Sequence, residues 1–330
     1  MPPEPPAATV AATADDLAGD GITIANLNIL HGSIWGADCD LTSDNCDAPG
    51  RVEIAARHIE ASGCPDVVTL QEVDLRVRDL LAAALDGLCE GVYTLSVYTV
   101  PSVSINVDME GILTKLPVID EYLLDLPAFP WSAHHVALDS GLGRVDLVTT
   151  HLASSAMNPP CLPGLCPPYC PPLSEDVKTC GARQILHYLG TSVPPDSVHI
   201  VTGDFNAEPG HIVYELFTAE TFFADTHRLA GNPECSPGAA PGCTSGGRGE
   251  PDGLYDPAAL SSEERIDYIM VRGHAGCAVV VDTAADLDTD AVGTGTWADL
   301  PADPPGSGGL GWASDHSGNQ ADIHCTAATP

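Results

Sequence analysis

The sequence has few basic residues: 12 lysines and arginines stand against 46 aspartates and glutamates in 330 residues, for a formal net charge of −34. Such a negative field repels polyanions, so the chain as a whole cannot recruit nucleic acid by neutralising phosphates. This weighs against a DNA substrate without excluding one. Very acidic surfaces are also typical of secreted and salt-adapted proteins, in which ionic strength screens the self-repulsion.

Long apolar runs are also missing from the sequence. No run approaches the roughly 20 apolar residues that a membrane-spanning helix needs. The first residues, MPPEPPAATVAATADD, lack the basic start and the apolar stretch of a signal peptide. We interpret residues 1–20 as a disordered leader. Hydrophobic residues nevertheless make up 44% of the chain, which is typical of a folded globular protein.

Cysteine, by contrast, is plentiful. The chain has 12 cysteines, and several lie close together in Pro/Gly-rich stretches: Cys39 and Cys46; Cys161, Cys166, Cys170 and Cys180; Cys235 and Cys243. An even count in loop-like segments favours disulfides. Disulfides in turn favour an extracellular or periplasmic location, with the export signal removed or absent from the chain as given. The alternative is a zinc site between Cys161 and Cys180, but this stretch lacks paired C-x-x-C units.

Short apolar runs rich in Val, Ile, Leu and Tyr predict many strands. We expect strands at residues 22–29, 66–71, 92–100, 110–114, 118–124, 133–138, 144–150, 198–203, 265–272, 277–282 and 320–324. Helical spacing of apolar residues predicts helices at 51–62, 75–87, 181–190 and 211–219. Many strands with few helices suggest an α/β or α+β sandwich, in which two sheets pack face to face with helices outside.

Three stretches rich in Pro, Gly, Cys or Asp interrupt this pattern, at 157–180, 230–262 and 283–313. We interpret them as loop insertions, because the polar motifs described below lie on both sides of each. Cutting the chain there would divide those motifs. We therefore expect residues 21–330 to form one catalytic domain.

The segment VTGDFNAEP, residues 201–209, is an apolar strand that ends abruptly in polar residues. Asp204 and Asn206 are two positions apart, so both side chains can lie on the same side if the strand continues. A carboxylate can orient or deprotonate a water molecule, and a neutral amide can hold a phosphoryl oxygen. The structural alternative is an Asx-turn before the next helix.

Two further strands end in potential metal ligands. DVVTLQEVD, residues 66–74, carries Glu72 at its exit, and ITIANLNILHG, residues 22–32, carries Asn26 and Asn28 near its end. Hard divalent cations such as Mg²⁺, Mn²⁺ or Ca²⁺ prefer carboxylate and other oxygen ligands. Glu72 suits that role, although it could equally be an ordinary carboxylate in the first turn of a helix.

The remaining candidates lie on later strands. VDLVTTHLASS, residues 145–155, places His151 at a strand end, where a single histidine is often an ordinary core or surface residue. RIDYIMVRG, residues 265–273, puts Asp267 within an apolar strand, and a buried carboxylate is costly unless it is paired. WASDHSGNQADI, residues 312–323, supplies a partner, with Asp315 and His316 just before the final strand. A buried aspartate bonded to one imidazole nitrogen would fix its tautomer.

Taken in order, the motifs N-x-N-I, L-Q-E-V, T-H-L, G-D-F-N-A-E-P, R-I-D-Y-I and S-D-H resemble those of the endonuclease/exonuclease/phosphatase superfamily. The resemblance covers about residues 22–325. The superfamily includes enzymes similar to DNase I, abasic-site endonucleases, neutral sphingomyelinases and inositol polyphosphate 5-phosphatases. The resemblance implies a four-layer α/β sandwich with two mixed sheets, and metal-dependent hydrolysis of phosphoesters.

By motif position, the resemblance also implies roles for individual residues. Glu72 would be the principal metal ligand, with Asn28 and Asp315 nearby. Asp204 and Asn206 would position the attacking water and the phosphate, Asp267 and His316 would form a dyad, and His151 would stabilise charge on the phosphoryl or leaving oxygen. The division of acid and base roles among His151, Asp204 and His316 stays open.

One acidic segment resembles a calcium-binding loop but departs from its pattern. In DLDTDAVG, residues 286–293, the glycine position of an EF-hand holds Ala291 and the final glutamate position holds Trp297. We therefore interpret this segment as a solvated acidic loop. No stable protein partner is implied.

Three functions remain open at this stage. A secreted nuclease would need a basic groove, for which few arginines are available: Arg144, Arg183, Arg228, Arg248, Arg265 and a few others. A sphingomyelinase-like phospholipid phosphodiesterase, or an inositol or sugar phosphatase, would tolerate an acidic surface. The loop at 157–173, with Met157, Leu162, Leu165 and Tyr169, is a weak candidate for contact with lipid. A noncatalytic binding protein on the same fold should have lost a catalytic residue, and none is lost.

Overall fold

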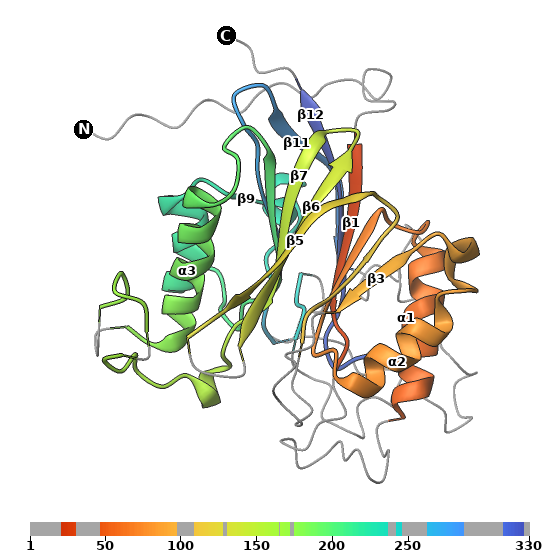
Figure 1. Cartoon of the computed structure of the whole chain (residues 1–330), viewed down its shortest axis with the longest axis horizontal. Helices are drawn as coiled ribbons and strands as arrows, with labels where there is room; N and C mark the ends of the chain where they lie inside the picture. The colour runs from red at the N-terminus through yellow and green to blue at the C-terminus, as the bar shows by residue number, and fades with distance from the viewer. Residues whose placement is uncertain are drawn as a thin grey trace.

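The computed structural model describes residues 21–30, 47–97, 109–127, 131–164, 166–171, 175–236, 242–245, 263–286 and 313–326. Two six-stranded mixed sheets form its centre (Figure 1). Sheet A has the order β11-β12-β1-β2-β4-β3. Its strands are β1 (Gly21–Asn28), β2 (Val67–Gln71), β3 (Thr94–Val97), β4 (Gly111–Thr114), β11 (Ala278–Asp286) and β12 (Asn319–Thr326).

Sheet B has the order β5-β6-β7-β8-β10-β9. Its strands are β5 (Val118–Asp125), β6 (Ser132–Ser140), β7 (Gly143–His151), β8 (Val198–Asp204), β9 (Ala224–Asp225) and β10 (Asp267–Arg272). The pairs β1–β2 and β7–β8 are parallel, whereas the other pairs in the described strands are antiparallel. The carboxyl ends of β1 and β2, and of β7 and β8, therefore lie together at one end of their sheets.

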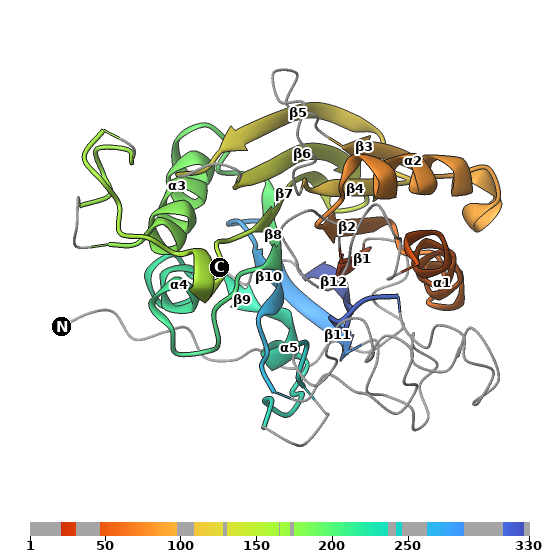
Figure 2. The ribbon, with the colours of Figure 1, turned by 90° about the horizontal axis from the view of Figure 1, so that it is seen from below.

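Helices cover the outer faces of both sheets (Figure 2). On sheet A lie α1 (Ala48–Ala61) and α2 (Leu75–Ala84), and on sheet B lie α3 (Val177–Thr191) and α4 (Ile212–Glu215). The shorter elements are α5 (Thr226–Leu229), the 3₁₀ turns η2 (Leu88–Gly91) and η3 (Ser155–Met157), and the π-helical turn η4 (Leu216–Glu220). Aspartates cap the long helices, since Asp74 accepts a hydrogen bond from the Val77 amide and Asp176 from the Thr179 amide.

Three apolar clusters fill the three spaces between these four layers. One joins sheet A to α1 and α2 through residues such as Val68, Leu70 and Ile59. A second joins sheet B to α3 and α4 and includes Val201 and Ile185. The third, with side chains such as Ile24 and Ile200, lies between the sheets. The four-layer α/β sandwich predicted from the sequence is therefore confirmed.

Strand alternation divides the space between the sheets into levels. At one level lie apolar side chains such as Ile24 and Ile200. Two residues further along the strands the side chains are polar and buried: Asn26, Thr69, Thr149 and Thr202. Gln71 links the sheets there by donating from Nε2 to Thr149 Oγ1 at 2.9 Å. The next level along these strands carries the ionisable site residues.

Most predicted elements are present, with several differences. Helix α1 begins at Ala48 rather than at 51, and the helix predicted at 211–219 is divided into α4 and the π-helical turn η4. Helix α3 begins at Val177 rather than at 181, because Asp176 caps it, so the 157–180 loop ends earlier than expected. β11 extends to Asp286, into the predicted 283–313 loop. The two-residue strand β9 and the four-residue helix α5 were not predicted, because so few residues leave no periodic pattern.

Several sequence-based expectations lie outside the described residues. These are the leader at 1–20, the pair Cys39 and Cys46, Arg248, Leu165, and the acidic segment 286–293 beyond the end of β11. In the described part of the chain, no helix is long and apolar enough to cross a membrane.

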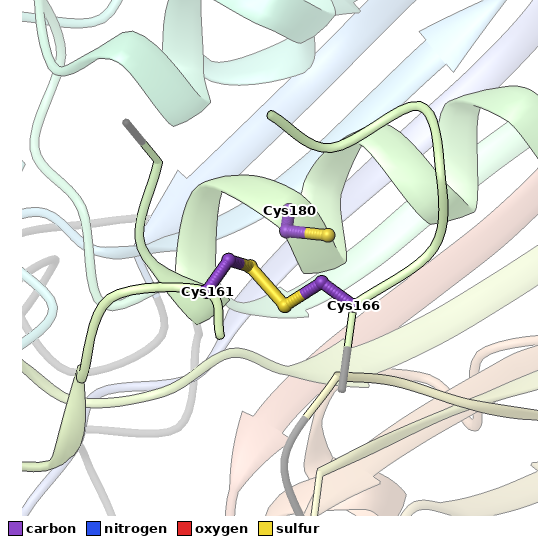
Figure 3. Close-up of side chains that lie close together, drawn as sticks. All are labelled: Cys161, Cys166 and Cys180. Carbon is purple, nitrogen blue, oxygen red and sulfur yellow. A yellow bond between two sulfur atoms is a disulfide. The ribbon is translucent and has the colours of Figure 1, made fainter. Parts of the chain in front are cut away.

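The ten described cysteines form five disulfides. The pairs are Cys64–Cys89, Cys161–Cys166, Cys170–Cys180, Cys235–Cys243 and Cys277–Cys325. Figure 3 shows Cys180, on α3, beside the Cys161–Cys166 bond. The sulfur atoms of these three residues lie within 4.8 Å of one another, which is compact enough for a metal site. All three are oxidised, however, so disulfide bonding takes the place of the alternative zinc site.

Candidate active site

The candidate residues converge at one edge of the sandwich. Each lies at or next to a strand end, and these strand ends are on the same side of the two sheets. Asn28, His151 and Asp204 are the last residues of β1, β7 and β8. Glu72 directly follows β2, and Asp267 is the first residue of the antiparallel strand β10. Asp315 and His316 precede β12.

Strand register brings three of these side chains together on sheet B. His151 is paired with Asp204 across β7 and β8, and Asp204 is paired with Asp267 across β8 and β10. All three share the inward-facing parity of Ile200 and Thr202. Imidazole Nε2 of His151 lies 3.5 Å from Oδ2 of Asp204.

Sheet A contributes Asn28 and Glu72. Nδ2 of Asn28 donates to Glu72 Oε1 at 2.8 Å and to Asp204 Oδ2 at 3.3 Å, which connects the two sheets. Glu72 has a left-handed backbone, with φ of 61°. This breaks the strand alternation after Gln71, so two consecutive side chains can reach the interior. Glu72 Oε1 also lies 3.9 Å from His151 Nδ1.

The turn after β8 holds Asn206 against Asp204. The Asn206 amide donates to Asp204 Oδ1 at 2.7 Å, and its side-chain Nδ2 donates to the Leu152 carbonyl at 2.9 Å. Asp204 and Asn206 thus form an Asx-turn, but it does not cap the helix expected from residue 211, because His211 caps α4. The turn does not compete with a role in the site, because Nδ2 carries a second N–H that can bond a phosphate oxygen.

Asp267 and His316 form the expected hydrogen-bonded pair. His316 Nδ1 lies 2.9 Å from Asp267 Oδ2, and Nε2 on the other side of the ring lies 3.9 Å from Asp204 Oδ2. The hydroxyl of Ser314 donates to the Asn28 carbonyl and to Asp315 Oδ1, which anchors the segment carrying Asp315 and His316 to the end of β1.

Burial and mutual repulsion set the charges of this cluster. Asp204 is 1% exposed, and burial, followed by the charge of Asp267, raises its pKa to about 6 despite the opposing influence of His151 and His316. Burial would by itself lower the pKa of His316, but Asp267, Asp315 and Asp204 raise it well above its usual value.

The donor set fits a divalent cation. Carboxylate oxygens of Asp204 and Asp267 and a nitrogen of His316 lie within 4.8 Å of one another. Asp267 Oδ1 is buried without a hydrogen-bond partner among the described residues, which is costly for a carboxylate. Glu72, whose Oε1 accepts from the same Asn28 amide that bonds Asp204, brings a further carboxylate next to this cluster, and hard cations prefer such oxygen ligands.

The site includes groups that the sequence motifs do not mark. Glu110, just before β4, is buried and accepts hydrogen bonds from the His151 amide and the Ser132 hydroxyl. Burial raises its pKa to about 7. The ring of Trp131 packs edge-on against His151, with centroids 5.3 Å apart. The one sequence signal for Glu110 was its position at the start of an apolar strand, in the segment DMEGI at residues 108–112.

Two buried cations hold the loops around the site. Arg51 of α1 donates from Nη1 to the carbonyls of Ile29 and Leu30, directly after β1. Lys178 of α3 donates from Nζ to the Asn206 carbonyl. Neither lies in a recognisable motif, so sequence reasoning did not single them out.

Solved structures share this fold. The complex of D. rerio TDP2 with single-strand DNA product has a TM-score of 0.59 and 15% identity, covering 92% of this chain and 99% of that one. The human Nocturnin catalytic domain gives 0.56 and 18%, covering 94% and 96%. The mannosyl-6-phosphatase Bt3783 of Bacteroides thetaiotaomicron gives 0.59 and 14%, covering 92% and 99%. At these identities the likeness shows a common fold and nothing finer.

A comparison with curated protein sequences finds no match. The profile of the Endonuclease/Exonuclease/phosphatase family, in contrast, matches residues 25–316, which include every candidate site residue from Asn28 to His316. Because the match spans most of the chain and the fold agrees with it, the chain belongs to the endonuclease/exonuclease/phosphatase family.

Proposed function

We propose that the chain is a phosphodiester hydrolase that depends on a divalent cation, Mg²⁺ or else Mn²⁺ or Ca²⁺. The observation that carries the proposal is the meeting of Glu72, Asp204 and the Asp267–His316 pair at one strand edge. Glu72, Asn28 and Asp315 would hold the cation beside Asp204, which Asn28 connects to Glu72 and which belongs to the Asp204–Asp267–His316 cluster. When bound, it would neutralise charge on a non-bridging phosphate oxygen and on the leaving oxygen.

The chain's own residues would arrange the attack by water. Asp204 can accept a hydrogen bond from that water, while Asp267 fixes the orientation of the His316 imidazole, whose Nε2 faces Asp204. Asn206 would bond a phosphate oxygen through its second amide N–H. His151, whose Nε2 also faces Asp204, would donate to a phosphoryl or leaving oxygen. The division of acid and base between the two histidines is left open.

The pairing of the arginines bears on the choice between a nucleic acid and a small phosphoester as substrate. Four of the arginines considered for a nucleic-acid groove are already paired with acids in the structure: Arg144 with Asp146, Arg183 with Glu175, Arg228 with Glu234 and Arg265 with Asp225. A secreted nuclease would therefore rely on its bound cation to attract DNA. Among the solved neighbours, both a DNA-product complex and a sugar phosphatase occur, so the fold is compatible with either class.

A phospholipid phosphodiesterase is the second candidate, because the β7–α3 segment exposes apolar side chains. Met157, Leu162 and Tyr169 are each 40–50% exposed. These side chains could contact a lipid surface, and a small phosphorylated head group would tolerate an acidic enzyme. An inositol or sugar phosphatase is the corresponding monoester alternative.

We also propose that the protein works outside the reducing cytosol. Five disulfides in the described part of the chain support an extracellular or periplasmic location. Disulfides of this number are seldom stable where thioredoxin and glutathione keep thiols reduced.

The test is hydrolysis of DNA, sphingomyelin and a sugar phosphate, side by side, with Mg²⁺ and with EDTA, at low and high salt. His316→Ala is the control for contaminating activity. Mg²⁺-dependent cleavage of DNA that the variant lacks would establish a nuclease, and release of phosphocholine would establish a lipid phosphodiesterase. Hydrolysis of the sugar phosphate alone would favour a phosphatase. If no substrate is hydrolysed with any of the three cations, a noncatalytic binding role is favoured and the result counts against the proposal.

A further inference from the structure

Lys178 is a buried cation at the edge of the site in a chain with 12 basic residues. It lies in the first turn of α3 and is 2% exposed. Burial lowers the pKa of its ammonium group, and the charges of Asp176, Asp204 and Glu264 oppose that effect. A lysine is rarely buried unless its ammonium group has specific partners.

Its partners belong to the site loop. Nζ donates to the Asn206 carbonyl and lies 3.5 Å from Ser155 Oγ. Asn206 has a left-handed backbone with φ of 49°, a conformation that asparagine tolerates better than most other non-glycine residues. The carbonyl of Asn206 is held by Lys178, the amide by Asp204 Oδ1 and the side chain by the Leu152 carbonyl.

These three contacts have different origins. The bonds to Asp204 and Leu152 come from β8 itself and from the end of β7, which already belong to the site edge. The bond from Lys178 comes from a helix on the outer face of sheet B, so it ties the Asp204–Asn206 turn to a separate rigid element. Without it, the peptide between Asn206 and Ala207 could rotate, and the amide bond to Asp204 would loosen with it.

We propose that Lys178 is a positioning residue, which fixes Asn206 and, through it, the Asp204 carboxylate in the geometry that hydrolysis requires. This inference rests on the proposed phosphoester hydrolysis. Lys178 itself is placed behind the turn, so it acts on the chemistry through Asn206 and touches no reacting atom. Displacement of a catalytic group by about 1 Å can lower a rate ~10²-fold, which sets the expected scale.

The test compares Lys178→Met, Lys178→Arg and Arg183→Met. Arg183 is the matched control, because it lies on the same helix but pairs with Glu175 and Glu220 away from the turn. Rates are measured on bis(p-nitrophenyl) phosphate with Mg²⁺, and folding is checked by thermal unfolding. We expect kcat to fall about 100-fold in Lys178→Met with KM changed by less than about twofold, a partial return of kcat in Lys178→Arg, and no change in Arg183→Met.

Hydrogen exchange of the peptide containing residues 204–207 is measured on the same proteins. Faster exchange in Lys178→Met than in Arg183→Met supports the positioning role even if the wild-type protein hydrolyses no phosphoester, in which case the proposed function fails instead. If the wild type is active and folded Lys178→Met keeps its kcat, or if exchange of this peptide is unchanged, Lys178 merely packs α3 against the loop and the inference is overturned.

Discussion

Asp204 has unfavourable electrostatic surroundings. It is buried beside a second carboxylate, Asp267, and the two histidines that face it compensate for only part of that cost, since its pKa is still raised to about 6. A group placed in this way is more stable when another positive charge is present. The proposed cation would supply that charge, and in the proposed mechanism the same placement would set a base next to the attacking water.

Glu110 provides a pH-dependent test at the same scale. Burial raises the pKa of Glu110 from 4.5 to about 7 in the folded state. The contribution of Glu110 to stability is therefore fully present below pH 4.5 and is lost as pH rises through about 7. Glu110→Gln removes this titration. We expect the variant to gain stability relative to wild type between about pH 5 and pH 8, by about 2 kcal/mol, measured by urea unfolding.

Glu121→Gln is the matched control for that experiment. Burial opposes the shift, but hydrogen bonds from Ser96 and His134 lower the pKa of Glu121, so its contribution is lost as pH falls rather than as it rises. The two variants should therefore show opposite trends with pH. Parallel trends would mean that the pH dependence does not come from Glu110.

Residues within motifs were easier to predict than residues acting singly. The partnership of Asp267 and His316 followed from the cost of an unpaired carboxylate in an apolar strand, and the hydrogen bond is present at 2.9 Å. Glu110, Arg51 and Lys178 are buried by contacts with segments far away in the sequence. Nothing in their immediate neighbours encodes those contacts, so local patterns cannot reveal them.

At the scale of the strands, the pairing of β7 with β8 holds His151 next to Asp204, and this pairing depends on a close approach at Gly203. Gly203 has a φ of 134°, and a Cβ at this position would lie 1.8 Å from the Thr150 carbonyl oxygen. We expect Gly203→Ala to separate β7 from β8 next to His151 and Asp204. The loss of unfolding free energy should be about 3 kcal/mol or more, measured by chemical denaturation, and activity should disappear with it.

Gly190→Ala is the comparison for this change. Gly190 lies in α3, and nothing lies within 4 Å of the position of its added Cβ. Alanine is favoured over glycine in a helix, so this variant should be as stable as the wild type or more stable, by up to about 1 kcal/mol. Equal destabilisation by both substitutions would show that the close approach at Gly203 is not what matters.

Strands were predicted well because alternation and apolar content act within a few residues. β1 and β8 were expected at 22–29 and 198–203 and are found at Gly21–Asn28 and Val198–Asp204. The start of α3 was placed late because its first turn lies among cysteines and polar residues, and its position depends on the Asp176 cap and on the Cys170–Cys180 bond. Such tertiary constraints have no periodic signature.

On the scale of the whole molecule, disulfides should differ in what they contribute. Cys277–Cys325 closes a separation of 48 residues, whereas Cys161–Cys166 closes one of 5. If the bonds act by restricting the unfolded chain, replacing the first pair by alanine should cost about 2 kcal/mol more than replacing the second. Thermal and urea unfolding of both double variants would measure this, and equal costs would argue against the chain-entropy explanation.

The net charge of the whole molecule and the charges of the site act on a substrate over different distances. A value of −34 repels anionic substrates at long range, whereas the proposed cation and the site histidines would act within a few ångströms. The two effects can be separated because salt screens the first more strongly than the second. The family and the four-layer fold were both evident from ordered motifs, but the substrate was not, because it depends on loops that lack a recognisable pattern.

Hydrolysis of bis(p-nitrophenyl) phosphate by wild type and Asp204→Asn, each with Mg²⁺ and with EDTA, tests the proposed metal-dependent centre most directly. We predict a rate that EDTA abolishes, that Mg²⁺ restores, and that Asp204→Asn lowers by about 10²–10³-fold in a protein that remains folded. A rate that persists in EDTA, or that folded Asp204→Asn retains in full, would contradict a metal-dependent centre built around Asp204.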